Sequence, residues 1–234
     1  MPKINYNIPA TSYCHGGSRA LSSVKYIVLH YTAVNGDTAK NEASYFSRNY
    51  SRYAGAHFFV DQGGVIAQSI ALNVTAWSVG GAKYYGTNPQ YYGACTNFNS
   101  VSIEMCDQVN KDASTKQIEA VKWLIKHIQS QCPNAKTIIR HYDVTGKPCP
   151  ARYLDVVKWT ALKNAVTGKA DASTTSYRVK IIETAVVRKK PSSASKKLMV
   201  LHPGGVYTIV KTKSKWGKLK SGAGWISLKK TKKV

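Results

Sequence analysis

Residues 24–30 read Val24-Lys25-Tyr26-Ile27-Val28-Leu29-His30, a short run rich in β-branched and aromatic side chains. Such a run predicts a buried β-strand. A helical pattern follows it, opening at Thr38. One face of this expected helix carries Ala39, Ala43, Phe46 and Tyr50. A strand followed by a helix of this kind is typical of layered α/β domains.

Strands and helices continue to alternate up to residue 166. Residues 56–60 and 65–68 flank Asp61-Gln62-Gly63-Gly64, which is a hairpin signature. The clearest helix spans 114–130, where Ser114 and Gln117 form a capping box. The other expected elements are strands at 101–105 and 137–140 and a closing helix at 154–166. This alternation predicts an α/β domain with a central sheet.

The residues at 167–176 are mostly small and polar, which is typical of a linker. The pattern of the sequence changes after this stretch. Short strand-like runs separated by Pro and Gly then follow one another closely. They lie at residues 178–182, 206–210, 216–220 and 224–228. This spacing predicts a small all-β barrel or sandwich.

The chain is strongly basic, with 34 Lys and Arg against 11 Asp and Glu and a net charge of +23. Residues 171–234 carry 16 of the basic and 2 of the acidic residues, a net of +14. Such a balance favours a polyanionic partner and suggests different tasks for the two parts of the chain. No recognition helix, zinc finger or RNP pattern is present, so we expect no specific nucleic-acid partner.

Three further features bear on the compartment in which the chain works. The longest apolar runs are only a few residues, so we expect no membrane insertion. The start, Met1-Pro2-Lys3-Ile4-Asn5-Tyr6, lacks the pattern of a signal peptide, which predicts synthesis in the cytoplasm of the host cell. Five irregularly spaced cysteines argue against a disulfide framework and leave a thiol available for metal binding.

Three residues are candidates for a metal site: His30, His141 and Cys149. Both histidines come at the ends of expected strands, where ligand sites gather in α/β sheets. Two His and one Cys suit Zn²⁺ and leave its fourth position open. Spacing alone leaves a second interpretation, in which the histidines are ordinary strand-end residues and Cys149 is a buried thiol.

Four segments, in the same order, resemble the zinc-dependent N-acetylmuramoyl-L-alanine amidases related to phage T7 lysozyme and the peptidoglycan recognition proteins. The resemblance covers roughly residues 20–165, and its segments are 26–32, 54–60, 101–104 and 141–150. It implies a mixed sheet flanked by helices. It also implies hydrolysis of the amide between N-acetylmuramic acid and L-alanine in peptidoglycan. By this resemblance His30, His141 and Cys149 match the three zinc ligands.

The resemblance also implies roles for two catalytic residues. Lys147 matches the residue that helps to stabilise the oxyanion. One branch of the family has a Tyr as the general base, but Ala56 stands at that position here. Another branch uses a Glu on a strand, which Glu104 matches. A solvated strand Glu and a solvated loop Lys are the alternative interpretations.

Two more residues are candidates for substrate binding, His57 and Trp77. His57 is equally consistent with an ordinary strand residue. Many relatives have Ala-Trp-His where this chain has Ala76-Trp77-Ser78. The replacement of that His by Ser78 puts the range of accepted peptidoglycan substrates in doubt.

The C-terminal part resembles bacterial SH3-type domains, most specifically in Trp216-Gly217-Lys218-Leu219-Lys220 and Gly224-Trp225-Ile226-Ser227-Leu228. The resemblance predicts a catalytic domain at 1–168, a linker at 169–176 and a wall-binding domain at 177–234. Such a chain is expected to act on the cell wall as a phage endolysin, released through a membrane lesion, or as an autolysin. A non-catalytic peptidoglycan-recognition protein is the alternative, against which the presence of Cys149 argues.

Overall fold

The strand predicted at residues 24–30 is present in the computed structural model as β3 (Tyr26–Tyr31). The structure describes residues 2–84, 86–168 and 177–234, so the predicted linker at 169–176 lies outside the described residues. The chain divides into two compact units, residues 1–169 and residues 170–234. β3 belongs to the first unit and lies inside a six-stranded sheet of order β1-β5-β4-β7-β3-β8.

The sheet of the first unit is mixed, as predicted. β3 is parallel to β7 (Ser100–Met105) and β8 (Thr137–Arg140), and β7 is parallel to β4 (Phe58–Val60). β5 (Ile66–Gln68) returns antiparallel to β4 through the predicted hairpin, and β1 (Ile4–Asn7) is parallel to β5 at one edge. A separate antiparallel pair consists of β2 (His15–Ser18) and β6 (Val74–Ala76).

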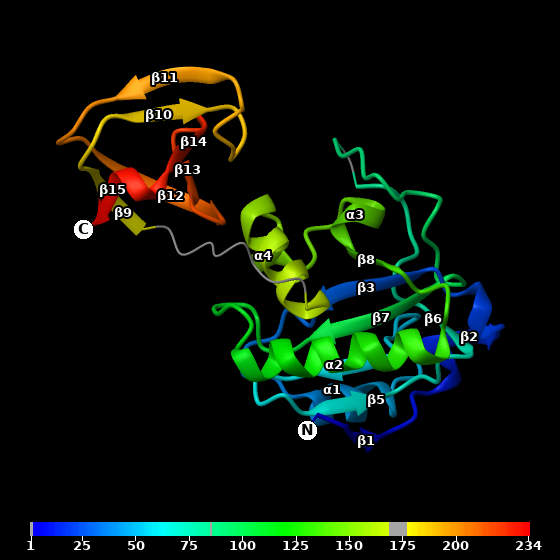
Figure 1. The fold of residues 1–234 in the computed structure, drawn as a ribbon. Helices are drawn as coiled ribbons and strands as arrows, with labels where there is room; N and C mark the ends of the chain where they lie inside the picture. The colour runs from blue at the N-terminus through cyan, green and yellow to red at the C-terminus, as the bar shows by residue number, and fades with distance from the viewer. Residues whose placement is uncertain (1, 85, 169–176) are drawn as a thin grey trace. The chain divides into compact units, whose positions relative to one another are not determined.

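Helices cover both faces of this sheet (Figure 1). α2 (Thr115–Gln131) and α4 (Val156–Thr167) pack through Leu124 and Leu162 on the main core, which holds Leu29 and Ile103 of the sheet. α1 (Ala39–Phe46) packs on the other face. The remaining helical segments are α3 (Tyr142–Thr145) and the 3-10 turns Ser12–Cys14, Leu21–Ser23 and Ala151–Tyr153.

Three local predictions are corrected by the structure. The helix that begins after Thr38 ends at Phe46, and Tyr50 lies beyond it with 67% of its surface exposed. Ser114 caps α2 by accepting a hydrogen bond from the Gln117 backbone (3.0 Å). The Gln117 side chain does not complete the capping box, because its Nε2 donates to the carbonyl oxygens of Val60 and Cys106. α4 begins at Val156, after the cap residue Asp155, rather than at residue 154.

Side chains alternate between the two faces of a strand, and this alternation separates the core from the functional face. On β7, Ile103 and Met105 enter the core beneath α2, so Glu104 between them points to the opposite face. On β3, Leu29 enters the same core, and His30 points away from it. The sheet therefore presents His30 and Glu104 on the face that α2 leaves uncovered.

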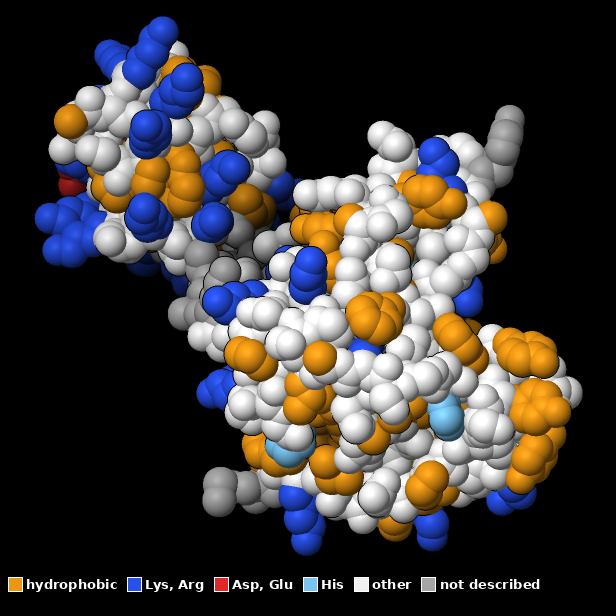
Figure 2. All heavy atoms as spheres, turned by 90° about the vertical axis from the view of Figure 1, so that its right-hand side faces the viewer, with side chains coloured by type: hydrophobic (Ala, Val, Ile, Leu, Met, Phe, Trp, Pro, Cys, Tyr) orange, Lys and Arg blue, Asp and Glu red, His pale blue; other side chains and the backbone are white. Residues whose placement is uncertain are grey.

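The second unit is all-β, as predicted. Its seven strands form an antiparallel sheet of order β11-β10-β14-β13-β12-β9-β15 around a core that contains Val187, Ile209 and Ile226. The strands are β9 (Tyr177–Ile181), β10 (Ala185–Arg188), β11 (Lys197–Leu201), β12 (Val206–Lys213), β13 (Trp216–Leu219), β14 (Trp225–Ser227) and β15 (Thr231–Lys233), with a 3-10 turn at Leu228–Lys230. Lys and Arg side chains surround a hydrophobic patch on the face of this unit in Figure 2. Among the described residues, no helix has the length and apolar character needed to cross a bilayer.

Candidate metal centre and its groove

His30 lies near the C-terminal end of β3, with only 2% of its surface exposed. The parallel register of β3 and β7 places it opposite Glu104. Its Nδ1 lies 3.8 Å from Glu104 Oε1. Two neighbouring strands thus bring an imidazole and a carboxylate together on the face opposite α2.

His141 and Cys149 reach the same place through a tight loop after β8. His141 directly follows β8, and the short helix α3 ends at Gly146, whose φ of 80° turns the chain back. The backbone N–H of Tyr142 donates to the Cys149 carbonyl oxygen (2.8 Å) and closes this loop. A Cβ at Gly146 would lie 2.6 Å from Thr87 Cβ and still closer to Thr87 Oγ1, so the turn requires a glycine.

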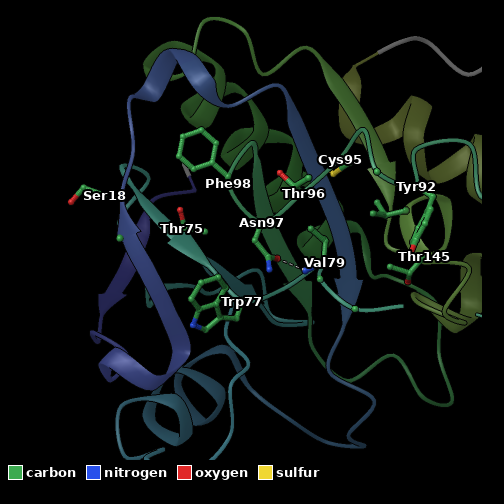
Figure 3. Close-up of a pocket in the computed structure, with 15 residues that line it drawn as sticks. Ser18, Thr75, Trp77, Val79, Tyr92, Cys95, Thr96, Asn97, Phe98 and Thr145 are labelled. Atoms are coloured by element: carbon green, nitrogen blue, oxygen red, sulfur yellow. Dashed lines mark hydrogen bonds between the residues drawn. The ribbon is translucent and has the colours of Figure 1, made fainter. Parts of the chain in front are cut away.

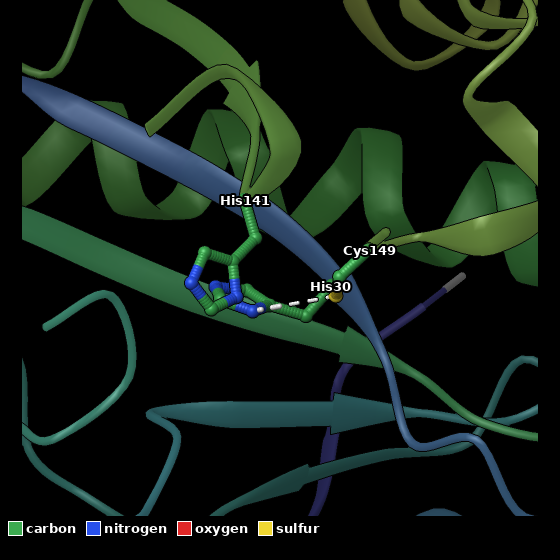
Figure 4. Close-up of side chains that lie close together, drawn as sticks. All are labelled: His30, His141 and Cys149. Atoms are coloured by element: carbon green, nitrogen blue, oxygen red, sulfur yellow. Dashed lines mark hydrogen bonds between the residues drawn. The ribbon is translucent and has the colours of Figure 1, made fainter. Parts of the chain in front are cut away.

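The structure therefore brings the three metal-ligand candidates together. Their donor atoms all lie within 4.8 Å of one another. The His30 and His141 rings are 4.7 Å apart between centroids, and Cys149 Sγ is 3.8 Å from His30 Nδ1 (Figure 4). The fold thus forms one cluster from three side chains, of which the first and the last, His30 and Cys149, are 119 residues apart in the sequence.

The chemistry of this cluster fits a divalent metal ion. His30 Nε2 and His141 Nδ1 are buried and have no hydrogen-bond partner among the described residues, which is costly for polar atoms. Burial lowers the pKa of His30 well below its usual value and that of His141 to about 4, so both rings are neutral at pH 7 and each keeps a lone pair. Burial raises the pKa of the Cys149 thiol, but a bound cation deprotonates a coordinating thiol. Two neutral imidazoles and one sulfur are a ligand set that Zn²⁺ prefers.

Glu104 and Lys147 border the cluster with opposite charges. Burial raises the pKa of Glu104 to about 7, against the opposing effects of Lys147 and Arg52. Glu104 Oε2 is buried without a hydrogen-bond partner among the described residues. The Lys147 side chain is exposed and lines the same cavity as Glu104 and Cys149. A proton acceptor and a positive charge thus lie beside the metal-ligand candidates.

Two cavities adjoin this cluster. The first, which we call the charged cavity, has a volume of about 590 Å³ and is lined by Glu42, Arg52, Glu104 and Lys147 among others. The second, the central cavity, has a volume of about 650 Å³ and is lined by His141, Lys147 and Trp77 among others. Because Lys147 lines both, the two cavities form one groove along the cluster.

The model of the Amidase_2 family, described as N-acetylmuramoyl-L-alanine amidase, matches residues 20–152 of this chain. The chain belongs to this family. The matched residues include all three metal-ligand candidates as well as Glu104 and Lys147.

Curated members of the amidase family are similar to the chain over most of its length. The N-acetylmuramoyl-L-alanine amidase BlyA of Bacillus subtilis is 33% identical over 182 residues, which are 74% of this chain and 48% of BlyA. CwlA of the same organism is 30% identical over 188 residues, which are 79% of this chain and 64% of CwlA. The chain thus spans about half to two thirds of the length of these relatives.

Two solved structures share the fold of the first unit. A mutant endolysin from Bacillus subtilis superposes with a TM-score of 0.55 at 25% identity. The superposition covers 70% of this chain and 99% of the endolysin chain. PlyL superposes with a TM-score of 0.57 at 23% identity. The superposition covers 71% of this chain and 98% of the PlyL chain. The alignments include nearly the whole of both solved chains, so the α/β fold of the first unit is the fold of these two structures.

The amidase fold separates the two candidates for substrate binding. Trp77 lines the central cavity together with His141 and Ser78. His57 is fully buried; its Nε2 accepts from Arg19 Nη2 (2.8 Å), and its Nδ1 lies 3.0 Å from Ser102 Oγ. Burial and the Arg19 charge lower the pKa of His57 to about 3. The structure therefore places His57 inside the fold and Trp77 in the groove.

Arg19 supports the groove, although no pattern in the sequence indicated such a role. Its guanidinium is buried and donates to the carbonyl oxygens of Leu72, Asn97, Phe98 and Ser100 at 2.7–3.1 Å. These bonds fix the segment that leads into β7 and so support one wall of the groove. No local motif surrounds Arg19, and the partners of its side chain lie 38–81 residues away along the chain.

Proposed function

We propose that this chain is a zinc-dependent N-acetylmuramoyl-L-alanine amidase. It would hydrolyse the amide between N-acetylmuramic acid and L-alanine in bacterial peptidoglycan. The observation that carries the proposal is the cluster of His30, His141 and Cys149, with Glu104 and Lys147 beside it in one groove. Membership of the amidase family and the relatives named N-acetylmuramoyl-L-alanine amidase support the same reaction.

His30, His141 and Cys149 would hold the metal ion. When bound there, Zn²⁺ supplies Lewis acidity, which polarises a carbonyl and makes water more acidic. Glu104 accepts a proton from the attacking water as the oxygen bonds to the carbonyl carbon. It then returns that proton to the nitrogen as the C–N bond breaks. A pKa of about 7 suits both steps near neutral pH.

Lys147 would stabilise the negative charge that develops on the substrate during the reaction. Lys147 lines both the charged and the central cavities, and its charge lowers the pKa of both His30 and His141. In the reaction this positive charge stabilises the carbonyl oxygen as it becomes negative. A preorganised donor of this kind contributes about 3–4 kcal/mol to transition-state stabilisation.

Product analysis tests the proposed bond. Purified protein with zinc is incubated with cell walls, and the soluble products are analysed by mass spectrometry and by N-terminal labelling. We expect peptides with a free N-terminal alanine and no increase in reducing sugar ends. New reducing ends without free alanine would show that a glycosidic bond is cut and would refute the amide assignment.

A non-catalytic recognition protein is the alternative that the groove also permits. It would bind wall fragments without needing a metal ligand at Cys149. Atomic absorption of the purified protein distinguishes the two, because the amidase is expected to hold about one zinc per chain. Zinc-free protein that binds muropeptides tightly and releases no alanine would support the alternative.

For the second unit, residues 177–234, we propose an SH3-type fold that binds a cell-wall polymer. Support comes from its all-β architecture and from its charge, since this range contains 16 Lys and Arg and one acidic residue, Glu183. Holding the catalytic unit, residues 1–168, near an insoluble polymer raises its effective concentration there. The chain would then act at the cell wall as an endolysin or an autolysin.

A further inference from the structure

A third cavity of about 700 Å³ lies in the first unit and has mainly apolar walls. We call it the apolar cavity. Figure 3 shows Phe98 and Trp77 on one side of it and Tyr92 on the other. Phe98 and Tyr92 are 55% and 50% exposed, although large apolar side chains gain free energy when they are buried. Their exposure around a hollow indicates a binding surface for a ligand with an apolar face.

The apolar cavity continues the groove of the metal centre. It shares Trp77, Asn97 and Thr145 with the central cavity, and the central cavity reaches His141 and Lys147. The three cavities thus follow one another in the order charged, central, apolar. A polymer bound at the cluster can extend into the cavity on either side of it.

The two outer cavities differ sharply in charge. No Lys, Arg, Asp, Glu or His is among the described residues that line the apolar cavity. The charged cavity has Glu42, Arg52, Glu104 and Lys147 in its walls. Peptidoglycan has the same asymmetry about the scissile amide. Its stem peptide carries ionised groups, whereas its glycan offers uncharged sugar rings with apolar C–H faces and N-acetyl groups.

Hydrogen bonds fix the polar part of the apolar cavity. Asn97 Oδ1 accepts from the backbone N–H groups of Ser78 (3.0 Å) and Val79 (2.8 Å). This orientation leaves Asn97 Nδ2 without a hydrogen-bond partner among the described residues, next to Gly80 in the wall shared by both cavities. Arg19 anchors the carbonyl oxygens of Asn97 and Phe98 from behind. A rigid amide donor between aromatic faces suits the carbonyl of an N-acetyl group.

We propose that the apolar cavity binds the N-acetylated sugar next to the muramoyl residue whose amide is cut. This inference rests on the proposed amidase function. The glycan strand runs from the central cavity past Trp77 to Tyr92 and Phe98, and the stem peptide lies in the charged cavity. The direction in which the substrate lies across the metal centre is thereby set by the difference in charge between the apolar and the charged cavities.

The test compares two substrates with the same stem peptide. One is a muramoyl peptide with a single sugar, and the other is a tetrasaccharide in which a muramoyl residue has a sugar on each side. In Phe98→Ala and, separately, Tyr92→Ala, we expect kcat/KM for the tetrasaccharide to fall about tenfold, the effect of losing about 1.4 kcal/mol of binding. The same ratio for the single-sugar substrate is expected to change less than about twofold, which is under about 0.5 kcal/mol.

A matched control is Tyr6→Ala, which removes an exposed aromatic ring of β1 that lines none of the cavities described above. We expect it to leave both substrates unaffected, and circular dichroism checks that all variants are folded. Equal losses on the two substrates in both cavity variants, or no loss on either, would overturn the inference. These results are distinct from failure of the proposed function, in which the unaltered protein would release alanine-terminated peptide from neither substrate.

Discussion

Replacement of Gly146 by alanine tests whether the turn after α3 holds Cys149 beside His30 and His141, the other two metal-ligand candidates. Gly146 has a φ of 80°, a conformation that costs a residue with a side chain about 1–2 kcal/mol. The new Cβ would also lie 2.6 Å from Thr87 Cβ and 2.9 Å from Thr87 Cγ2, so one of them must move. Thr87 does not move freely, because its Oγ1 donates to the Tyr84 carbonyl oxygen (2.6 Å).

The expected cost follows from these two effects. Overpacking of this kind costs about 1–3 kcal/mol, so with the backbone strain the total is about 3 kcal/mol. For a unit of this size that corresponds to a fall in Tm of roughly 6–12 °C. Displacement of the loop also moves Cys149 Sγ, and a metal site tolerates shifts of only about 0.2 Å. We therefore expect zinc affinity to fall at least about tenfold, in line with the loss of supporting contacts at other metal sites.

Differential scanning fluorimetry measures the Tm, and titration against a competing chelator measures zinc affinity. Gly86→Ala is the matched control, since Gly86 has a similar φ of 72° but open space around its would-be Cβ. It should lose only about 1 kcal/mol, from backbone strain, and bind zinc normally. If Gly146→Ala matches Gly86→Ala in both Tm and zinc affinity, the turn does not position Cys149 and the reasoning fails.

Three further predictions follow from the groove and the basic unit. Glu104→Gln should keep one zinc per chain but lower kcat about 100- to 10,000-fold, the usual contribution of a general base, as measured by alanine release; near-normal kcat would exclude Glu104 as the base. Burial is the largest cause that raises the pKa of Glu42 to about 8 from its usual 4.5, and a hydrogen bond that protonated Glu42 donates to Asp37 adds to it, so the folded state loses stability as pH rises between these values. Glu42→Gln should therefore raise the Tm by an increasing amount from pH 4.5 to 8, and a gain that shrinks over this range would contradict that sign. Binding of the whole chain to cell walls in a sedimentation assay should weaken as salt rises from about 0.05 M to about 0.5 M, because the charges of residues 177–234 become screened; salt-independent binding would point to apolar contacts instead.

Local patterns in the sequence predicted several elements correctly, although β1, β10 and β11 had no predicted counterpart. The apolar run at β3, the hairpin between β4 and β5 and the cap of α2 at Ser114 all lie where the sequence places them. Tyr50 shows the limit of such patterns. Its spacing from Phe46 fits a helix, but the helix ends at Phe46 and the Tyr50 ring instead contacts Tyr13 in an edge-on arrangement.

The sequence by itself indicated where several of the strands and helices lie, and it identified His30, His141 and Cys149 as metal-ligand candidates from their residue types and positions and from their resemblance to a family. Strand alternation and helix periodicity are local properties, so a short window of residues is enough to reveal them. Only the tertiary structure decided that His57 lies inside the fold on Arg19, that Glu104 faces His30, and that an uncharged cavity continues the groove. These features depend on contacts between residues far apart in the chain, which no local pattern encodes, because packing of the whole unit selects them.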